Sequence, residues 1–146
     1  MVEVILSYET LDKLADAFIP LLAIIFLLAT VIIFFRSPDD RKALGKTFIY
    51  GVFLIVISYG LMFLDKRFHL WHSAGLDYST HTAVSLALII PLCLLLKRYQ
   101  TVFIISALAY TALMLYQKYH SMMDIVTTAA VISLCALLIH KWLFSK

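Results

Sequence analysis

Residues 17–35 read AFIPLLAIIFLLATVIIFF, an almost unbroken apolar run that ends at Arg36. A run of this length matches the about 20 apolar residues that one membrane-spanning helix needs. Pro20 falls near the start of the run, where a helix tolerates proline because an amide in the first turn has no acceptor within the helix. The run therefore predicts a first transmembrane helix.

The composition of the whole chain also indicates a membrane protein. Of its 146 residues, 63% are hydrophobic and 14% are charged, whereas soluble domains average roughly 45–50% apolar and about 25% charged residues. So apolar a chain needs a lipid environment, and we expect one membrane domain over residues 1–146. The net charge of +3 does not point to nucleic acid, and we expect no nucleic-acid partner.

Further apolar runs predict a polytopic all-α bundle of five transmembrane helices. We expect the spans at about 17–35, 46–64, 81–96, 101–116 and 121–144. The third and fourth runs are short for a bilayer, so we expect those two helices to extend beyond them. Residues 1–16 have a weak amphipathic pattern and predict a separate interfacial segment. Gly51 and Gly60 in the second span would allow close helix packing.

The basic residues are divided unevenly between the two faces that five spans create. Eight lie on the face that carries the C-terminus, namely Arg36, Arg41, Lys42, Lys46, Lys97, Arg98, Lys141 and Lys146. Four lie on the face that carries the N-terminus, namely Lys13, Lys66, Arg67 and Lys118. Because basic residues accumulate on the cytoplasmic side, this asymmetry predicts a cytoplasmic C-terminus and an outward N-terminus. We expect a multi-pass protein of a bacterial inner (plasma) membrane.

Two histidines stand where the third and fifth predicted spans begin, both on the outward face. Residues 77–82 (DYSTHT) contain His81, and residues 119–124 (YHSMMD) contain His120 and Asp124. On a helix, residues four apart share a face, so the carboxylate of Asp124 would fix the tautomer of His120 and raise its basicity. An acid inside an apolar span is costly and is therefore a functional candidate. These residues predict a shared catalytic site, with His120 as base or nucleophile.

The same face offers groups that suit a phosphate. The free amides at the start of a helix bind anions, and nearby cations neutralise their charge. We therefore expect the substrate-binding residues to be Ser79, Thr80, Lys66, Arg67 and Lys118, with no metal ion and no organic cofactor. Two alternatives stay open: Ser79 can simply cap its helix, and the long cationic side chains can simply reach the membrane interface.

In these two stretches the chain resembles the type-2 phosphatidic acid phosphatase superfamily, which includes sphingomyelin-synthase-like lipid phosphotransferases. The second motif of that superfamily, Pro-Ser-Gly-His, corresponds to residues 78–81, and the histidine and aspartate of its third motif correspond to His120 and Asp124. The resemblance implies that His120 forms a phosphohistidine, that Asp124 orients it, and that His81 protonates the leaving group. It covers roughly residues 65–130.

The chain departs from the superfamily pattern in the residues that clamp phosphate. Met114 stands where the third motif has an arginine, and Thr80 stands where the second motif has a glycine. The first motif, a lysine followed after six residues by Arg-Pro, is missing from residues 65–80. The chain thus has the two histidines, the aspartate and the serine of the superfamily motifs, and lacks the arginines of those motifs.

Together, these features predict a membrane-embedded lipid phosphatase that hydrolyses a lipid phosphate or a polyprenyl pyrophosphate. Transfer of a phosphorylated head group between lipids at the same site is one alternative. A non-catalytic lipid-binding or assembly subunit is another, and a b-type haem protein ligated by His81 and His120 is a third. The expected partners are the phospholipid or polyprenyl phosphate substrate and the membrane, and so small a bundle is also a candidate for a homo- or hetero-oligomer.

Overall fold

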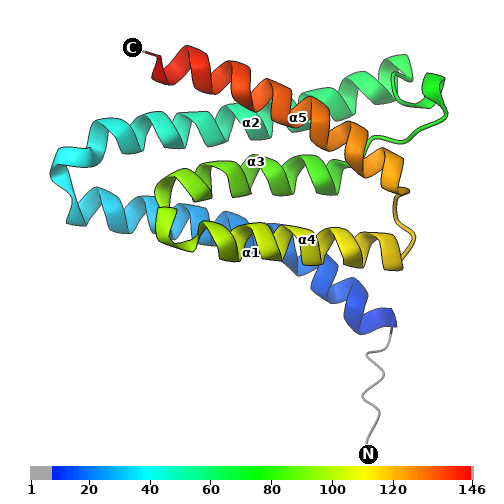
Figure 1. The fold of residues 1–146 in the computed structure, drawn as a ribbon, viewed down its shortest axis with the longest axis horizontal. Coiled ribbons are helices and arrows are strands. Elements are labelled where there is room, and N and C mark those ends of the chain that lie inside the picture. The colour runs from blue at the N-terminus through cyan, green and yellow to red at the C-terminus, as the bar shows by residue number, and fades with distance from the viewer. Residues whose placement is uncertain (1–7, 146) are drawn as a thin grey trace, which may run out of the picture.

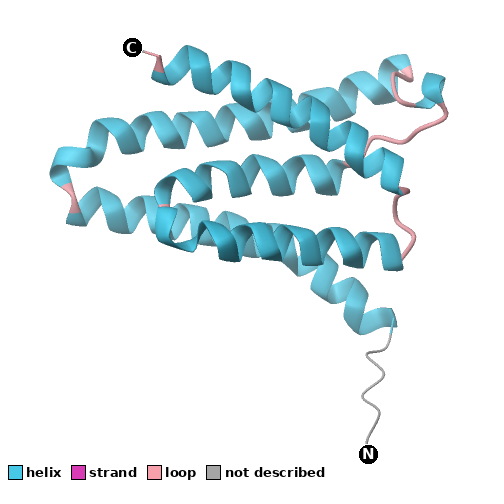
Figure 2. Cartoon of the chain, viewed as in Figure 1, coloured by secondary structure: helices cyan, strands magenta, loops and turns pink. Residues whose placement is uncertain are grey.

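The computed structural model describes residues 8–145, and within this range the fold is an all-α bundle (Figures 1 and 2). Its five α-helices are α1 (Tyr8–Arg36), α2 (Arg41–Phe68), α3 (Thr80–Leu95), α4 (Gln100–Tyr116) and α5 (Met122–Phe144). Short 3-10 helices lie in three of the connections, namely η1 (Pro38–Asp40), η2 (His72–Ala74) and η3 (Lys97–Tyr99). The predicted all-α bundle is confirmed.

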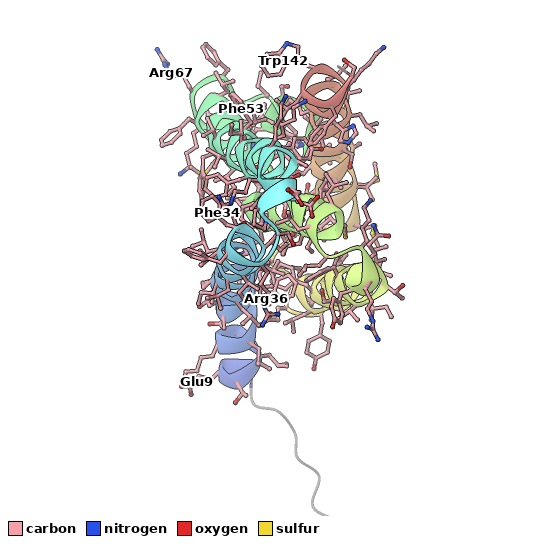
Figure 3. All side chains as sticks on the ribbon, turned by 90° about the vertical axis from the view of Figure 1, so that its left-hand side faces the viewer. Glu9, Phe34, Arg36, Phe53, Arg67 and Trp142 are labelled. Carbon is pink, nitrogen blue, oxygen red and sulfur yellow. The ribbon has the colours of Figure 1, made fainter. Side chains whose placement is uncertain are left out.

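Four helical segments are long and apolar enough to cross a membrane, namely α1, α2 with η1, α4 together with η3 (Lys97–Tyr116, 20 residues), and α5. Their outward faces carry large apolar side chains, such as the exposed Phe34, Phe53 and Trp142 (Figure 3). A continuous apolar surface of this kind is unfavourable in water and suits the hydrocarbon interior of a bilayer. The helical backbone meanwhile pairs its own polar groups, as a lipid environment requires.

The remaining helix, α3, is shorter and occupies the centre of the bundle. Its 16 residues span about 24 Å, less than the about 30 Å of a hydrocarbon core. The expected extension of this helix is wrong, because η3 follows directly and starts at Lys97. α3 packs against all four other α-helices and buries residues such as Ala83, Ala87 and Leu92 completely. Since protein surrounds most of α3, its length does not have to match the bilayer.

The first helix begins earlier than the sequence predicted. α1 runs without a break from Tyr8 to Arg36, so residues 8–16 do not form a separate interfacial helix. The remainder of that expected segment, residues 1–7, lies outside the described residues. Ala15 is 1% exposed and packs with Tyr110, Met114 and Ile125 of α4 and α5. This packing explains why residues 8–16 continue the first span.

One of the two predicted packing glycines lies at a close helix contact. A Cβ atom at Gly51 of α2 would lie 2.8 Å from the ring of Phe26 in α1, which is too close for van der Waals contact. Around Gly60 a Cβ atom would meet nothing within 4 Å. Gly51 therefore lets α1 and α2 approach, whereas Gly60 does not serve helix packing.

The connections between the helices gather at opposite ends of the bundle (Figure 1). One end carries the connections 37–40 and 96–99 and the end of α5, and we call it the basic end. The other carries the start of α1 and the connections 69–79 and 117–121, and we call it the histidine end. Both histidine stretches therefore lie at the same end, where α3 and α5 begin.

Candidate active site at the histidine end

The structure brings His81 and His120 together. His81 lies in the first turn of α3, and His120 lies in the connection just before α5. The centroids of their rings are 6.5 Å apart, and the ring planes are inclined by 56°. The side chain of His120 is only 10% exposed. Two imidazoles thus share one small region at the start of the bundle's central helix.

Asp124 is buried and binds backbone amides instead of His120. Its Oδ2 accepts a hydrogen bond from Ser121 N (2.8 Å), while Ser121 Oγ accepts one from Asp124 N (3.2 Å), which forms a capping box. Its Oδ1 accepts a hydrogen bond from Asp77 N (2.8 Å). Since α5 begins at Met122, His120 precedes the helix, and the helical spacing used to pair it with Asp124 does not apply. The orienting contact predicted for Asp124 is absent from the hydrogen bonds of the described residues.

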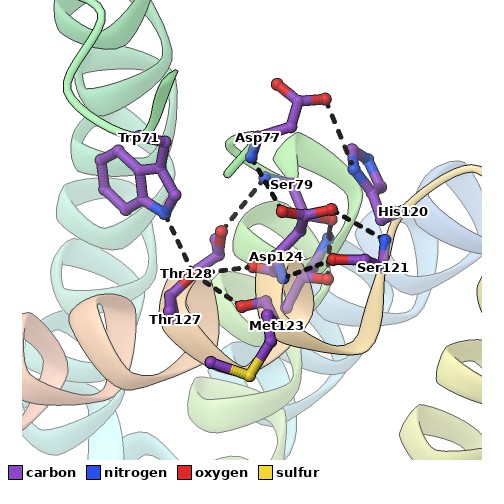
Figure 4. Close-up of polar contacts among 10 residues, drawn as sticks. Trp71, Asp77, Ser79, His120, Ser121, Met123, Asp124, Thr127 and Thr128 are labelled. Carbon is purple, nitrogen blue, oxygen red and sulfur yellow. Dashed lines mark hydrogen bonds and ion pairs between the residues drawn. The ribbon is translucent and has the colours of Figure 1, made fainter. Parts of the chain in front are cut away.

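The carboxylate that faces His120 belongs to Asp77 (Figure 4). Its Oδ2 lies 3.6 Å from His120 Nδ1, within ion-pair range but beyond a hydrogen bond. His120 Nδ1 is buried and, among the described residues, has no hydrogen-bond partner, whereas the side chain of Asp77 is 73% exposed. A small rotation of the Asp77 side chain would therefore give His120 Nδ1 an acceptor. Asp77, instead of the predicted Asp124, is therefore the carboxylate that faces the His120 ring.

Two threonines of α5 help to hold the loop that leads into α3. Trp71 Nε1 donates a hydrogen bond to Thr127 Oγ1 (3.2 Å), and Ser79 N donates one to Thr128 Oγ1 (3.1 Å). Thr128 is completely buried. With the contact made by Asp124, these bonds fasten the start of α3 to the first turns of α5 (Figure 4). This fastening places the two histidines side by side.

Tyr78 ties the same loop to α2. It is 5% exposed, and its hydroxyl donates a hydrogen bond to the carbonyl oxygen of Ser58 in α2 (2.8 Å). Burial raises the pKa of the Tyr78 hydroxyl, so the hydroxyl keeps its proton and remains a donor over the physiological range. The loop before α3 is thus tied to α2 as well as to α5.

His81 lies between two tyrosines. Its Nδ1 is 3.0 Å from the hydroxyl of Tyr110 in α4, and the ring of Tyr119 stacks against it at 6.1 Å. The hydroxyl of Tyr119 in turn donates a hydrogen bond to Asp12 of α1. With Nδ1 occupied by Tyr110, Nε2 is the ring nitrogen of His81 that is left for a ligand. Helices α1 and α4 and the connection before α5 therefore contribute to the surroundings of His81.

The two predicted phosphate contacts at the start of α3 have different surroundings. Ser79 is completely buried and caps α3: its Oγ accepts a hydrogen bond from Thr82 N (3.3 Å) and is 2.8 Å from Thr82 Oγ1. The capping role of Ser79 is confirmed, and the side chain has no exposed surface for a substrate. Thr80 is half-buried in the first turn of the same helix, so its contact with phosphate stays a prediction.

The three predicted cations lie at the histidine end without touching the pair. Lys66 and Arg67 are exposed in the last turn of α2, and Arg67 projects outward in Figure 3, with its guanidinium 6.0 Å from the centroid of the Phe68 ring. Lys118 is exposed and has a left-handed backbone with φ of 58°. Over the described range, none of the three forms a hydrogen bond or ion pair with either histidine.

Three residues of this site were not identified from the sequence, namely Tyr110, Thr127 and Thr128. All three lie inside apolar helices, where threonine and tyrosine are common. The spacing from Asp124 to Thr127 and Thr128 places these side chains on one face of α5, and this polar face is the signal that was available. Nothing in the sequence indicated that Tyr110 of α4 would reach His81.

Among residues 8–145, no group of three or more histidine, cysteine, aspartate or glutamate side chains has the arrangement of a metal site. The chain matches no family model, and no curated protein sequence or solved structure is significantly similar to it. The function is therefore argued from the geometry of the histidine end.

Proposed function

We propose that the protein crosses the membrane five times, with the histidine end outward, and transfers a phosphoryl group from a lipid phosphate or polyprenyl pyrophosphate to water. The observation that carries the proposal is the pair of imidazoles with centroids 6.5 Å apart, each with its Nδ1 facing a protein oxygen. The unequal division of basic residues, eight against four, supports the orientation.

In the proposed reaction, His120 is the nucleophile. Asp77 faces His120 Nδ1 at 3.6 Å and favours the tautomer with the proton on Nδ1, which leaves a lone pair on Nε2. The Nε2 atom attacks phosphorus, so an N–P bond forms while the P–O bond to the lipid breaks. The step involves no oxidation or reduction. It therefore needs only a proton for the departing oxygen.

His81 supplies and recovers that proton. The contact between its Nδ1 and the hydroxyl of Tyr110 holds the ring while Nε2 donates a proton to the departing oxygen of the lipid. A water molecule then attacks the phosphohistidine, the N–P bond breaks, and His81 Nε2 accepts the proton of that water. Both histidines return to their starting states. Replacement of water by a lipid alcohol gives the head-group transferase on the same pair.

Charge neutralisation is the main requirement of phosphoryl transfer. At the histidine end, the start of α3 supplies backbone amides and the positive end of a helix dipole beside His81. Lys118 lies two residues before His120, and Lys66 and Arg67 have long side chains that extend from the end of α2. We assign the neutralisation of the phosphate to these groups.

A non-catalytic lipid-binding subunit is the second candidate, and the positions of the arginines favour it. Arg36, Arg41 and Arg98 all belong to the basic end. The remaining arginine, Arg67, is directed away from the bundle in Figure 3. An arginine fork binds phosphate in two-pronged geometry that lysine does not reproduce. A site without it would bind a lipid phosphate and not turn it over.

The test is phosphate release by the purified protein in detergent, from a panel of phosphatidic acid, lysophosphatidic acid and a polyprenyl pyrophosphate. His81→Ala and His120→Ala should each lower the rate by about 10²–10⁴. His72→Ala is the matched control, because His72 is an exposed histidine of the same end and should leave the rate unchanged. Equal, nonzero release by all four proteins would contradict the catalytic proposal.

Two further measurements separate the alternatives. Radiolabelled head group appearing on an added lipid alcohol would identify transfer instead of hydrolysis. Absence of release from every substrate, together with retention of the lipid phosphate by the wild-type protein, would favour the non-catalytic subunit. A Soret absorption band in the purified protein would show a haem and would remove the phosphatase assignment of the two histidines.

A further inference from the structure

Two hollows lie side by side toward the basic end of the bundle. The first has a volume of about 430 Å³ and is lined by Asp39, Lys42, Ala43, Lys46 and Phe144. The second has a volume of about 390 Å³, lies between α2, α3 and α5, and is almost entirely apolar, with Tyr50, Leu94, Leu137 and His140 in its walls. The residues that line both hollows belong to the part of the bundle toward the basic end, away from the histidine pair.

The side chain of Phe144 joins the two hollows. Its ring stacks on His140 at 4.6 Å and meets the edge of Tyr50 at 6.0 Å, and both of those residues line the apolar hollow. On the polar side, Lys46 Nζ lies 5.9 Å from the centroid of the same ring. This cation–π contact keeps the ammonium group of Lys46 at the polar hollow. A molecule that covers Phe144 would therefore meet an ammonium group on one side and apolar side chains on the other.

The charges of the polar hollow favour a phosphate. Its lining contains two ammonium groups, Lys42 and Lys46, against the single carboxylate of Asp39. Beyond the hollow, the basic end also carries Arg36, Arg41, Lys97, Arg98 and Lys141, which raise the positive potential around it. Ammonium groups are good partners for phosphate oxygens.

The apolar hollow favours a hydrocarbon chain. Leu137 of α5 lines it and is exposed, as expected for a helix that faces lipid. The hydroxyl of Tyr50 is already bonded to the carbonyl oxygen of Ala136 (3.0 Å), so it offers no free donor to a polar guest. A flexible chain of methylene groups suits such a lining.

We propose that the two hollows form a binding site for one anionic phospholipid. Its phosphate lies between Lys42 and Lys46, and one acyl chain enters the apolar hollow beside Leu94 and Leu137. The lipid thereby packs against Phe144 near the end of α5 and ties this helix to the start of α2. The site is independent of the histidine pair and of the proposed phosphoryl transfer.

The test measures lipid retention by the purified protein in detergent, with native mass spectrometry and titrated phosphatidylglycerol. Lys42→Gln combined with Lys46→Gln should weaken binding by about 30-fold, since each basic residue near a membrane surface contributes about fivefold. Arg98→Gln combined with Lys141→Gln is the matched control, because it removes the same charge from the same end outside the hollow. This control should change binding less than about twofold.

Three further arms decide what the site recognises. Asp39→Asn should strengthen phosphatidylglycerol binding several-fold, because it removes the carboxylate that repels the phosphate. Leu137→Trp should weaken binding about tenfold by filling the apolar hollow. Phosphatidylcholine should bind more weakly than phosphatidylglycerol, and inorganic phosphate should compete only at far higher concentration.

Several results would overturn the proposal. Equal losses in the two double variants would mean diffuse attraction to the basic end without a site. Equal binding of the two phospholipids would show that the lysines do not recognise net negative charge. Competition by inorganic phosphate at the same concentration as the lipid would show that the acyl chain contributes nothing to binding. Each variant is compared only after its elution volume and thermal unfolding in detergent match those of the wild type.

Discussion

Asp77 Oδ2 lies 3.6 Å from His120 Nδ1, and this contact joins the loop before α3 to the connection before α5. The other carboxylate of the region, Asp124, is directed at the backbone amides of Asp77 and Ser121. Two acids within one site therefore have different tasks. Asp77 is exposed and faces the imidazole, whereas Asp124 is buried and holds the backbone. Substitution of each acid separates catalysis from stability.

Asp77→Asn should lower phosphate release by at least about tenfold and leave stability unchanged. The amide cannot favour the Nδ1-protonated tautomer of His120 as a carboxylate does, so the nucleophile becomes less basic. Stability should persist because the side chain is 73% exposed and a surface substitution usually changes unfolding by under about 0.5 kcal/mol. Steady-state rates and thermal unfolding in the same detergent test both halves. Full activity in the variant would remove Asp77 from the mechanism.

Asp124→Ala should destabilise the protein by about 1–3 kcal/mol. The change leaves the amides of Asp77 and Ser121 without their carboxylate acceptor, and it destroys the capping box at the start of α5. Denaturant unfolding in detergent micelles measures the loss, with Asp77→Ala as the comparison because that side chain accepts no such bond. Wild-type stability of Asp124→Ala would show that the backbone contacts are not important.

The helices and the meeting of the histidines could be predicted from the sequence, because both depend on long apolar runs. α3 and α5 begin at the same end of the bundle because α4 returns the chain between them. His81 and His120 stand where these two helices begin. The partner of His120 was wrongly predicted, because the helical spacing to Asp124 applies only if α5 begins before His120, whereas the expected span begins at residue 121. The capping box of Ser121 and Asp124 decides this and leaves His120 outside the helix.

Other features depend on packing that the sequence does not reveal. Tyr110 reaches His81 because of the rotation of α4 about its axis, which the uniform apolarity of residues 101–116 leaves undetermined. The short length of α3 is tolerated because other helices surround it, whereas an apolar run alone does not distinguish a central helix from one that faces lipid. The role of Gly51 likewise depends on the neighbouring Phe26.

Tyr110→Phe should reduce activity several-fold through His81 alone. The hydroxyl of Tyr110 lies 3.0 Å from His81 Nδ1, and its removal lets the imidazole rotate without removing the ring packing of Phe18 on Tyr110. A double-mutant cycle tests the route, because Tyr110→Phe should have no further effect in a His81→Ala background. Additive losses would show that Tyr110 acts independently of His81.

Phosphate release should follow a bell-shaped dependence on pH. A protonated nucleophile has no lone pair with which to attack phosphorus, so the rate falls as the pH decreases. In base the acid His81 loses the proton that the departing oxygen needs, so the rate falls as the pH increases. The profile belongs to the pair rather than to either residue. His72→Ala should give the same bell, and a flat rate from pH 5 to 8 in the wild type would contradict the assignment of both histidines.

Gly51→Ala and Gly60→Ala should have opposite effects on stability, although both replace a glycine inside α2. At Gly51 the new methyl group would lie 2.8 Å from the Phe26 ring, so the ring or the helix must shift, which costs about 1–3 kcal/mol. At Gly60 the methyl group meets nothing within 4 Å, and alanine should stabilise the helix by about 0.5–1 kcal/mol. Thermal unfolding of the two variants in one detergent gives the comparison. Equal shifts in the same direction would mean that α1 and α2 do not approach at Gly51 as the structure shows.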